Sequence, residues 1–144
     1  MLIDVVIFGE TQFMSKILTY ECFSKVKNKI KNREFYGCIC DDKPHKNFLV
    51  NIADISHKVV IKKISKHGIK GELTILKTKY GTILEELISH TDVVFKPALS
   101  GGFNMWNDFY VKDIISIDAY CNKQDIKKIR IKKLNNIFGV GKLK

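Results

Sequence analysis

Short runs of hydrophobic residues, separated by polar and glycine-containing turns, predict that strands dominate this chain. Leu2 to Phe8 is almost wholly apolar and rich in β-branched residues, which is typical of a buried strand that ends at Gly9. From Thr11 to Lys31, apolar residues recur every three to five positions with lysines between them, and this spacing predicts an amphipathic helix. The chain is therefore expected to begin with a strand and a long helix.

The remaining pattern predicts further strands and one short helix. Thr82 and Glu85 have the spacing of a helix-capping box, which predicts a helix over 82–90. A turn containing Gly68 joins two predicted strands into a hairpin, and a turn region at 101–104 separates the last two. The order predicts an α+β fold around a mostly antiparallel or barrel-like sheet. The expected strands after the first are residues 34–40, 57–64, 71–78, 92–97 and 111–120.

Composition favours one ordinary globular domain. With 144 residues, of which 45% are hydrophobic, such a chain buries roughly two-thirds of its unfolded surface. No apolar run approaches the roughly 18 to 20 residues that cross a bilayer, and a leader pattern is missing, so we expect a soluble protein that is not secreted and has no membrane partner. Only two of the four cysteines, Cys38 and Cys40, are close in sequence, without paired C-x2-C motifs. We expect reduced, buried thiols, no metal and no cofactor.

The net charge of +10 is concentrated near the C-terminus. Residues 122–144 carry seven Lys, one Arg and one Asp. This segment is interpreted as a basic tail that follows a domain of residues 1–121. A tail of this kind either binds an acidic surface or a polyanion such as DNA, or only keeps the protein in solution. The candidate binding residues in it are Lys127, Lys128, Arg130, Lys132 and Lys133.

Aromatic side chains form a second candidate binding feature. Phe103, Trp106 and Phe109 lie within seven residues, together with Met105 and Tyr110. Aromatic and methionine side chains often anchor protein interfaces, so this segment predicts a contact surface for a partner. The alternative is that these side chains close one end of the core.

Four stretches of the sequence stand out in this order: TQFMSKILTYECFSKVKNKIKNREFYG, VNIADISHKVV, GIKGELTILKTKYGTILEEL and VFKPALSGG…VKDIISIDAY. Together they resemble the prohead maturation proteases of tailed bacteriophages, which share a fold with the herpesvirus capsid assembly proteases. The resemblance covers about residues 11–120 and implies a role in virion assembly, in the host cytoplasm or the virion. Capsid or scaffold proteins, or further copies of the chain, are the implied partners.

The catalytic positions implied by the resemblance are altered in this chain. Serine proteolysis needs a hydroxyl, an imidazole that takes its proton and a group that orients the imidazole. Counted from Tyr36-Gly37 without gaps, Asp41 stands where the family has its histidine, and a small insertion brings His45 there instead. Counted from Gly81 and Leu84, Pro97 and Ala98 stand where active members have Ser-Ser.

With a shifted alignment of the serine loop, the chain still has a candidate catalytic serine. If the loop slides by about three residues, Ser100 becomes the nucleophile, and the best trio is Ser100, His45 and Asp118. His57, in DISHKVV, is expected to be a structural histidine at a strand. Three hypotheses follow: a virion assembly protein with a prohead-protease-like fold and no peptidase activity, an active serine endopeptidase that processes capsid and scaffold precursors, or a small basic nucleic-acid-binding protein.

Overall fold

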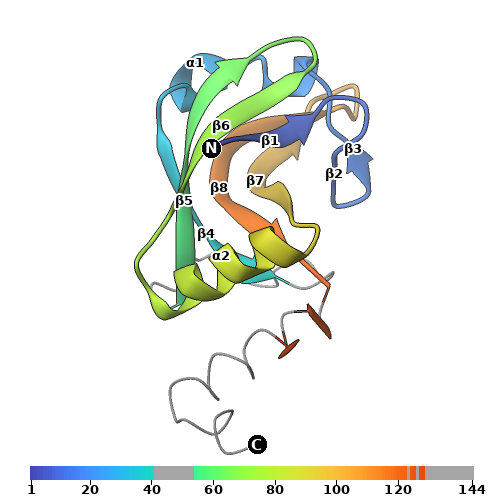
Figure 1. Ribbon diagram of the computed structural model, residues 1–144. Coiled ribbons are helices and arrows are strands. Elements are labelled where there is room, and N and C mark those ends of the chain that lie inside the picture. The colour runs from blue at the N-terminus through green and yellow to red at the C-terminus, as the bar shows by residue number, and fades with distance from the viewer. Residues whose placement is uncertain (41–53, 123, 126, 129–144) are drawn as a thin grey trace, which may run out of the picture.

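The computed structural model describes residues 1–40, 54–122, 124–125 and 127–128, and shows a curled sheet with two α-helices (Figure 1). Six strands form the sheet in the order β1-β6-β5-β4-β8-β7. All neighbours are antiparallel except β4 and β8, which are parallel. The predicted α+β class with a mostly antiparallel, barrel-like sheet is thus confirmed at this level, as a half-barrel. The strands are β1 (Leu2–Ile7), β4 (Glu34–Cys40), β5 (Ile55–Ile64), β6 (Gly68–Ile75), β7 (Val94–Phe103) and β8 (Phe109–Tyr120).

The long helix expected between Thr11 and Lys31 is wrong. Met14 and Ser15 have positive φ angles of 49° and 65°, and they turn the chain between the short strands β2 (Gln12–Phe13) and β3 (Lys16–Ile17). A single 3-10 turn, η1 (Glu21–Phe23), and the one-turn helix α1 (Lys27–Ile30) follow.

The physical reason lies in the spacing of the apolar residues. At 100° per residue, the positions from Phe13 to Ile30 drift by about 260° around a helix, so they do not share one face. Short turns instead bury Leu18, Phe23 and Ile30 in the core, where each is at most 1% exposed. Ile17, which the helix would have placed with them, is 55% exposed.

Helix α2 (Lys79–His90) begins one turn earlier than predicted. Its N-cap is Thr78, whose hydroxyl accepts a hydrogen bond from the Gly81 N–H at 3.0 Å, so the expected cap at Thr82 lies inside the helix. Leu84 and Leu87 are fully buried, and α2 covers the end of the half-barrel drawn lowest in Figure 1. The predicted β5–β6 hairpin is confirmed, although Gly68 begins β6 rather than forming the turn.

The β7–β8 hairpin is longer than predicted, and it carries the segment expected to be a loop. Gly101 and Gly102 pair with Val111 and Tyr110 within the strands, so the turn lies at 104–108. Strand β7 is at one edge of the sheet, a position where proline is tolerated because only one side of the strand pairs with a neighbour.

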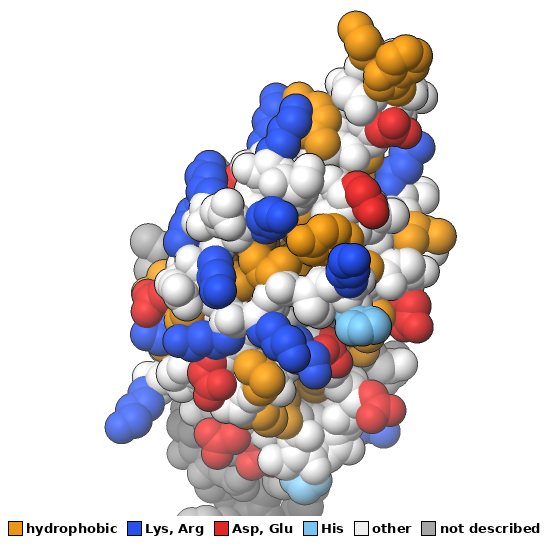
Figure 2. Space-filling model, turned by 90° about the horizontal axis from the view of Figure 1, so that it is seen from above, with side chains coloured by type: hydrophobic (Ala, Val, Ile, Leu, Met, Phe, Trp, Pro, Cys, Tyr) orange, Lys and Arg blue, Asp and Glu red, His pale blue; other side chains and the backbone are white. Residues whose placement is uncertain are grey.

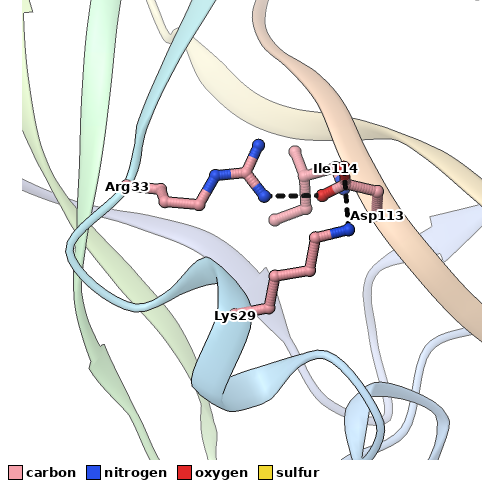
Figure 3. A network of polar contacts seen from close by, with 4 residues as sticks. All are labelled: Lys29, Arg33, Asp113 and Ile114. Atoms are coloured by element: carbon pink, nitrogen blue, oxygen red, sulfur yellow. Dashed lines mark hydrogen bonds and ion pairs between the residues drawn. The ribbon is translucent and has the colours of Figure 1, made fainter.

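An ion-pair network joins the N-terminal segment to β8 (Figure 3). Lys29 and Arg33 converge on the carboxylate of Asp113, at 3.4 and 3.1 Å, and one of its oxygens also accepts from the Ile114 N–H at 2.9 Å. All three charged side chains are at least 32% exposed, so their contribution to stability is small, about 1 kcal/mol or less for each pair.

All four cysteine side chains are buried and none is in a disulfide, as expected. No helix among the described residues is long and apolar enough to span a membrane. In the predicted basic tail, Lys127 and Lys128 are helical and exposed, whereas Arg130, Lys132 and Lys133 lie outside the described residues.

Candidate functional site

Ser100 lies in β7 beside an apolar groove, rather than on a loop. It pairs with Asp113 of β8, and register shifts flank it on both sides, between Ala98 and Leu99 and between Ser100 and Gly101. Its hydroxyl makes no hydrogen bond to any described residue, which includes the three described histidines. The groove has a volume of about 520 Å³ and runs between the β2–β3 hairpin and the β7–β8 hairpin; it is lined by Phe13, Met14, Lys16, Leu99, Ser100, Gly101, Phe103, Phe109 and Ile115.

Asp118 is remote from Ser100. Its partner across the hairpin is Lys96, four residues before Ser100, which corresponds to about 14 Å along a strand. An imidazole that hydrogen-bonds to both groups can span only two hydrogen bonds of about 3 Å each and the width of its ring, which is much less than this separation. The carboxylate also accepts from the Cys38 N–H and from the Ser116 hydroxyl, both at 3.0 Å. The structure therefore separates two members of the proposed trio, and the third, His45, lies outside the described residues.

His57 is a buried, fully bonded residue, as the sequence predicted. Its Nε2 lies 2.6 Å from the carbonyl oxygen of Ile117, which can only accept, so Nε2 carries the proton. In the neutral ring, Nδ1 then accepts from the Ser56 hydroxyl at 2.7 Å. The ring of Phe95 packs against the imidazole edge to face, with the ring centres 5.3 Å apart. Burial lowers the pKa of His57 from 6.5 to about 4, against a smaller raising effect of the Ile117 bond.

The same region also suppresses the ionisation of Cys38 and Tyr120. Burial, followed by the charge of Asp118, raises the pKa of the Cys38 thiol to about 11. Burial also raises the pKa of Tyr120, and Cys40 and Asp118 add to this effect. The Ser56–His57 pair resembles a catalytic dyad in its distance, but both residues are 0% exposed, so a substrate has no access to it. Sequence reasoning did not single out Ser56.

The exposed counterpart of the groove is a cluster of large apolar side chains, which we call the apolar tip: Met14, Ile17, Phe103, Met105 and Trp106. These residues are 76%, 55%, 54%, 88% and 78% exposed. Seen from above, hydrophobic side chains gather at the projecting end of the molecule (Figure 2). Phe103 and Trp106 were predicted to bind a partner, whereas Met14 and Ile17 were missed because the β2–β3 hairpin was predicted as helix.

The apolar tip is held by an ordered turn. The side-chain oxygen of Asn104 accepts from the N–H groups of Trp106 and Asp108, both at 2.9 Å, and the Asn104 N–H donates to the Asp108 carbonyl at 3.0 Å. Asn107 takes a left-handed φ of 63°. These bonds fix the backbone while Met105 and Trp106 extend into solvent.

Phe109 has a different role from the tip. It is only partly exposed and packs against the core, with its ring 6.3 Å from Phe13 and 5.8 Å from Phe103. Lys16 lies over Phe103, with Nζ 5.7 Å from the ring centre. The predicted aromatic segment is therefore divided: Phe109 supports the base of the groove, while Phe103 and Trp106 face outward.

No protein-family model, curated protein or solved structure matches this chain. Among the described residues, no group of three His, Cys, Asp or Glu side chains is placed to hold a metal ion.

Proposed function

We propose that this chain is a virion assembly protein with a prohead-protease-like fold, which binds capsid or scaffold protein and lacks peptidase activity. Three features support this proposal: the resemblance of the four sequence stretches, the loss of the catalytic residues in the gapless alignment, and the placement of Ser100. A serine inside a paired strand, about 14 Å along that strand from the position opposite the candidate acid, is poorly placed for a proton relay.

The observation that carries the binding role is the apolar tip. Exposed Trp and Met side chains cost hydration free energy in a free protein, and such residues are the typical anchors of protein interfaces. The turn that carries them is fixed by four hydrogen bonds of Asn104, so little backbone conformational entropy is lost when a partner covers them. The groove beside Ser100 continues this surface and offers a place for an apolar side chain of the partner.

The only tryptophan of the chain reports directly on this surface. Because Trp106 is 78% exposed, its fluorescence should shift to shorter wavelength when purified scaffold or capsid protein of the encoding phage covers it. The Trp106→Ala and Met105→Ala variants should weaken binding in a pull-down with the same proteins. Tyr36→Ala provides the matched control, because Tyr36 is an exposed aromatic residue on β4, away from the tip.

The peptidase alternative is tested on the same protein. A serine-directed fluorophosphonate should leave the folded chain unlabelled. Labelling at Ser100, together with cleavage of a capsid-precursor peptide that Ser100→Ala abolishes, would reject the proposal in favour of an active endopeptidase.

A further inference from the structure

Lysines gather at the turn end of the β5–β6 hairpin, on other strands and turns than the apolar tip. The β5–β6 register shifts between Ile61 and Lys63, which is a β-bulge at Lys62. Side chains of a regular strand alternate between its two faces, but at this bulge both Lys62 and Lys63 are exposed. Lys66 is exposed in the turn that follows.

Neighbouring segments add charge to the same place. Lys63 stands directly opposite Lys70 of β6, a like-charge pair that is unfavourable unless an anion lies nearby. On the other side of β5, the Asn32 N–H donates to the Ile61 carbonyl at 2.8 Å, and the Ile61 N–H donates to the Arg33 carbonyl at 3.2 Å. These bonds bring exposed Lys31 beside the bulge. We call this group, which consists of Lys31, Lys62, Lys63, Lys66 and Lys70, the lysine patch.

The acidic residues around the lysine patch leave most of its charge uncompensated. Asp4 reaches only Lys70, at 3.8 Å. Glu34 pairs with Lys58 at 3.2 Å, outside the patch, and Asp113 pairs with Lys29 and Arg33. Within the part of the chain that the structure describes, no carboxylate forms an ion pair with Lys31, Lys62, Lys63 or Lys66. Figure 2 shows Lys and Arg side chains spread over the middle and left of this face.

The surroundings of the patch distinguish a nucleic acid from a protein partner. Protein interfaces bury an apolar core, and aromatic residues are enriched in it. On the strands next to the patch, the exposed large hydrophobic side chains are Leu2 and Ile7 of β1 and Tyr36 of β4, and they are scattered, opposite Glu72, Gly68 and Lys58. A phosphate backbone needs no such anchor, because its affinity comes from neutralised charge and released counterions. We propose that the lysine patch is a binding site for the phosphate backbone of nucleic acid, independent of the function proposed above.

The test compares two triple variants of the full chain that have the same net charge. One replaces Lys62, Lys63 and Lys66 with Gln. The other replaces Lys77, Lys79 and Lys96 with Gln; these three are also exposed but lie before, at the start of and after α2. Binding to a fluorescent 20-base-pair duplex is followed by anisotropy from low to moderate salt.

We expect the patch variant to bind roughly tenfold more weakly or worse at 0.1 M salt, and the slope of log K against log salt to become shallower by about 2.7 for three lost phosphate contacts. The control variant should keep most of the affinity and slope. A Lys→Arg triple at the patch positions should bind as the wild type does, which separates loss of charge from misfolding.

Three results would overturn the site. In the first, the patch variant would keep the wild-type affinity and slope. In the second, both Gln variants would lose affinity equally, which would show an effect of net charge alone. In the third, polyglutamate would displace the duplex as effectively, per charge, as unlabelled DNA does, which would point to an acidic protein surface instead.

Discussion

Acidification should destabilise this protein through His57. Its pKa is 6.5 in an unfolded chain and about 4 in the fold, so between these values the unfolded state binds the proton that the folded state refuses. The free energy of unfolding is therefore unaffected by His57 above pH 6.5 and falls as the pH drops from 6.5 towards 4. A shift of one pKa unit corresponds to about 1.4 kcal/mol, so the full loss is about 3 kcal/mol, of which about 2 kcal/mol is reached at pH 5.

The hydrogen bonds around the ring limit this cost. When Nδ1 gains a proton, it turns from acceptor to donor towards Ser56, and the Ser56 hydroxyl is then free to donate to the Gly37 carbonyl at 3.4 Å. That bond is long and weak, but it leaves no buried donor without a partner. The cost of protonating His57 therefore comes from burying the charge and not from losing a hydrogen bond. We therefore expect stability to fall gradually with pH rather than to collapse sharply near pH 6.

Urea unfolding of the wild type and of His57→Gln between pH 7.5 and 4.5 measures the effect. All other groups are the same in both proteins, so the difference between the two pH profiles isolates His57. The wild type should lose about 2 kcal/mol more than the variant between pH 7.5 and 5. Parallel profiles, or a His57 ring proton that titrates near pH 6.5 in NMR spectra, would refute the reasoning.

Two further predictions concern the same buried region. Gly37→Ala should lower the free energy of unfolding by about 3 kcal/mol or more, because the new Cβ would lie 1.8 Å from the Ile117 oxygen. Gly9→Ala is the control and should cost only about 1–2 kcal/mol, because its φ is +87° but no atom lies within 4 Å of the new Cβ. Equal losses in urea titrations would contradict the close packing of β4 on β8. The four buried thiols should react with a disulfide reagent at pH 8 only after unfolding, since Cys38 has a pKa of about 11, and rapid labelling of the native protein would contradict the structure.

The strands could be predicted from sequence because their apolar residues report burial directly. Residues 34–40 were predicted as a strand and form β4 with the same bounds, and the hairpin of β5 and β6 follows from two apolar runs around one turn. The segment after β1 failed for the opposite reason. Its apolar residues sit on several short turns that follow the curved sheet, so their spacing in sequence does not have the period of a single helix or strand.

The candidate site was predictable only where one segment carries it. Phe103 and Trp106 lie within a single turn, so the sequence shows their clustering. The groove and the Cys38 partner of Asp118 depend on contacts between segments that are distant in sequence, and the lysine patch depends on the register of the β5–β6 hairpin. The bulge at Lys62, which exposes two consecutive lysines, cannot be seen without the pairing of β5 with β6.

The two proposed binding surfaces differ in the force that drives each of them, and this difference makes them separable. Partner binding at the apolar tip buries Met and Trp side chains, so its affinity should change little with salt. Binding of a phosphate backbone at the lysine patch releases counterions and should weaken steeply as salt rises. Because the two surfaces lie on different strands and turns, Trp106→Ala should leave duplex binding intact, and the Lys62, Lys63 and Lys66 triple variant should leave the Trp106 fluorescence shift intact. If either variant abolished both activities, the two surfaces would have to be parts of one site.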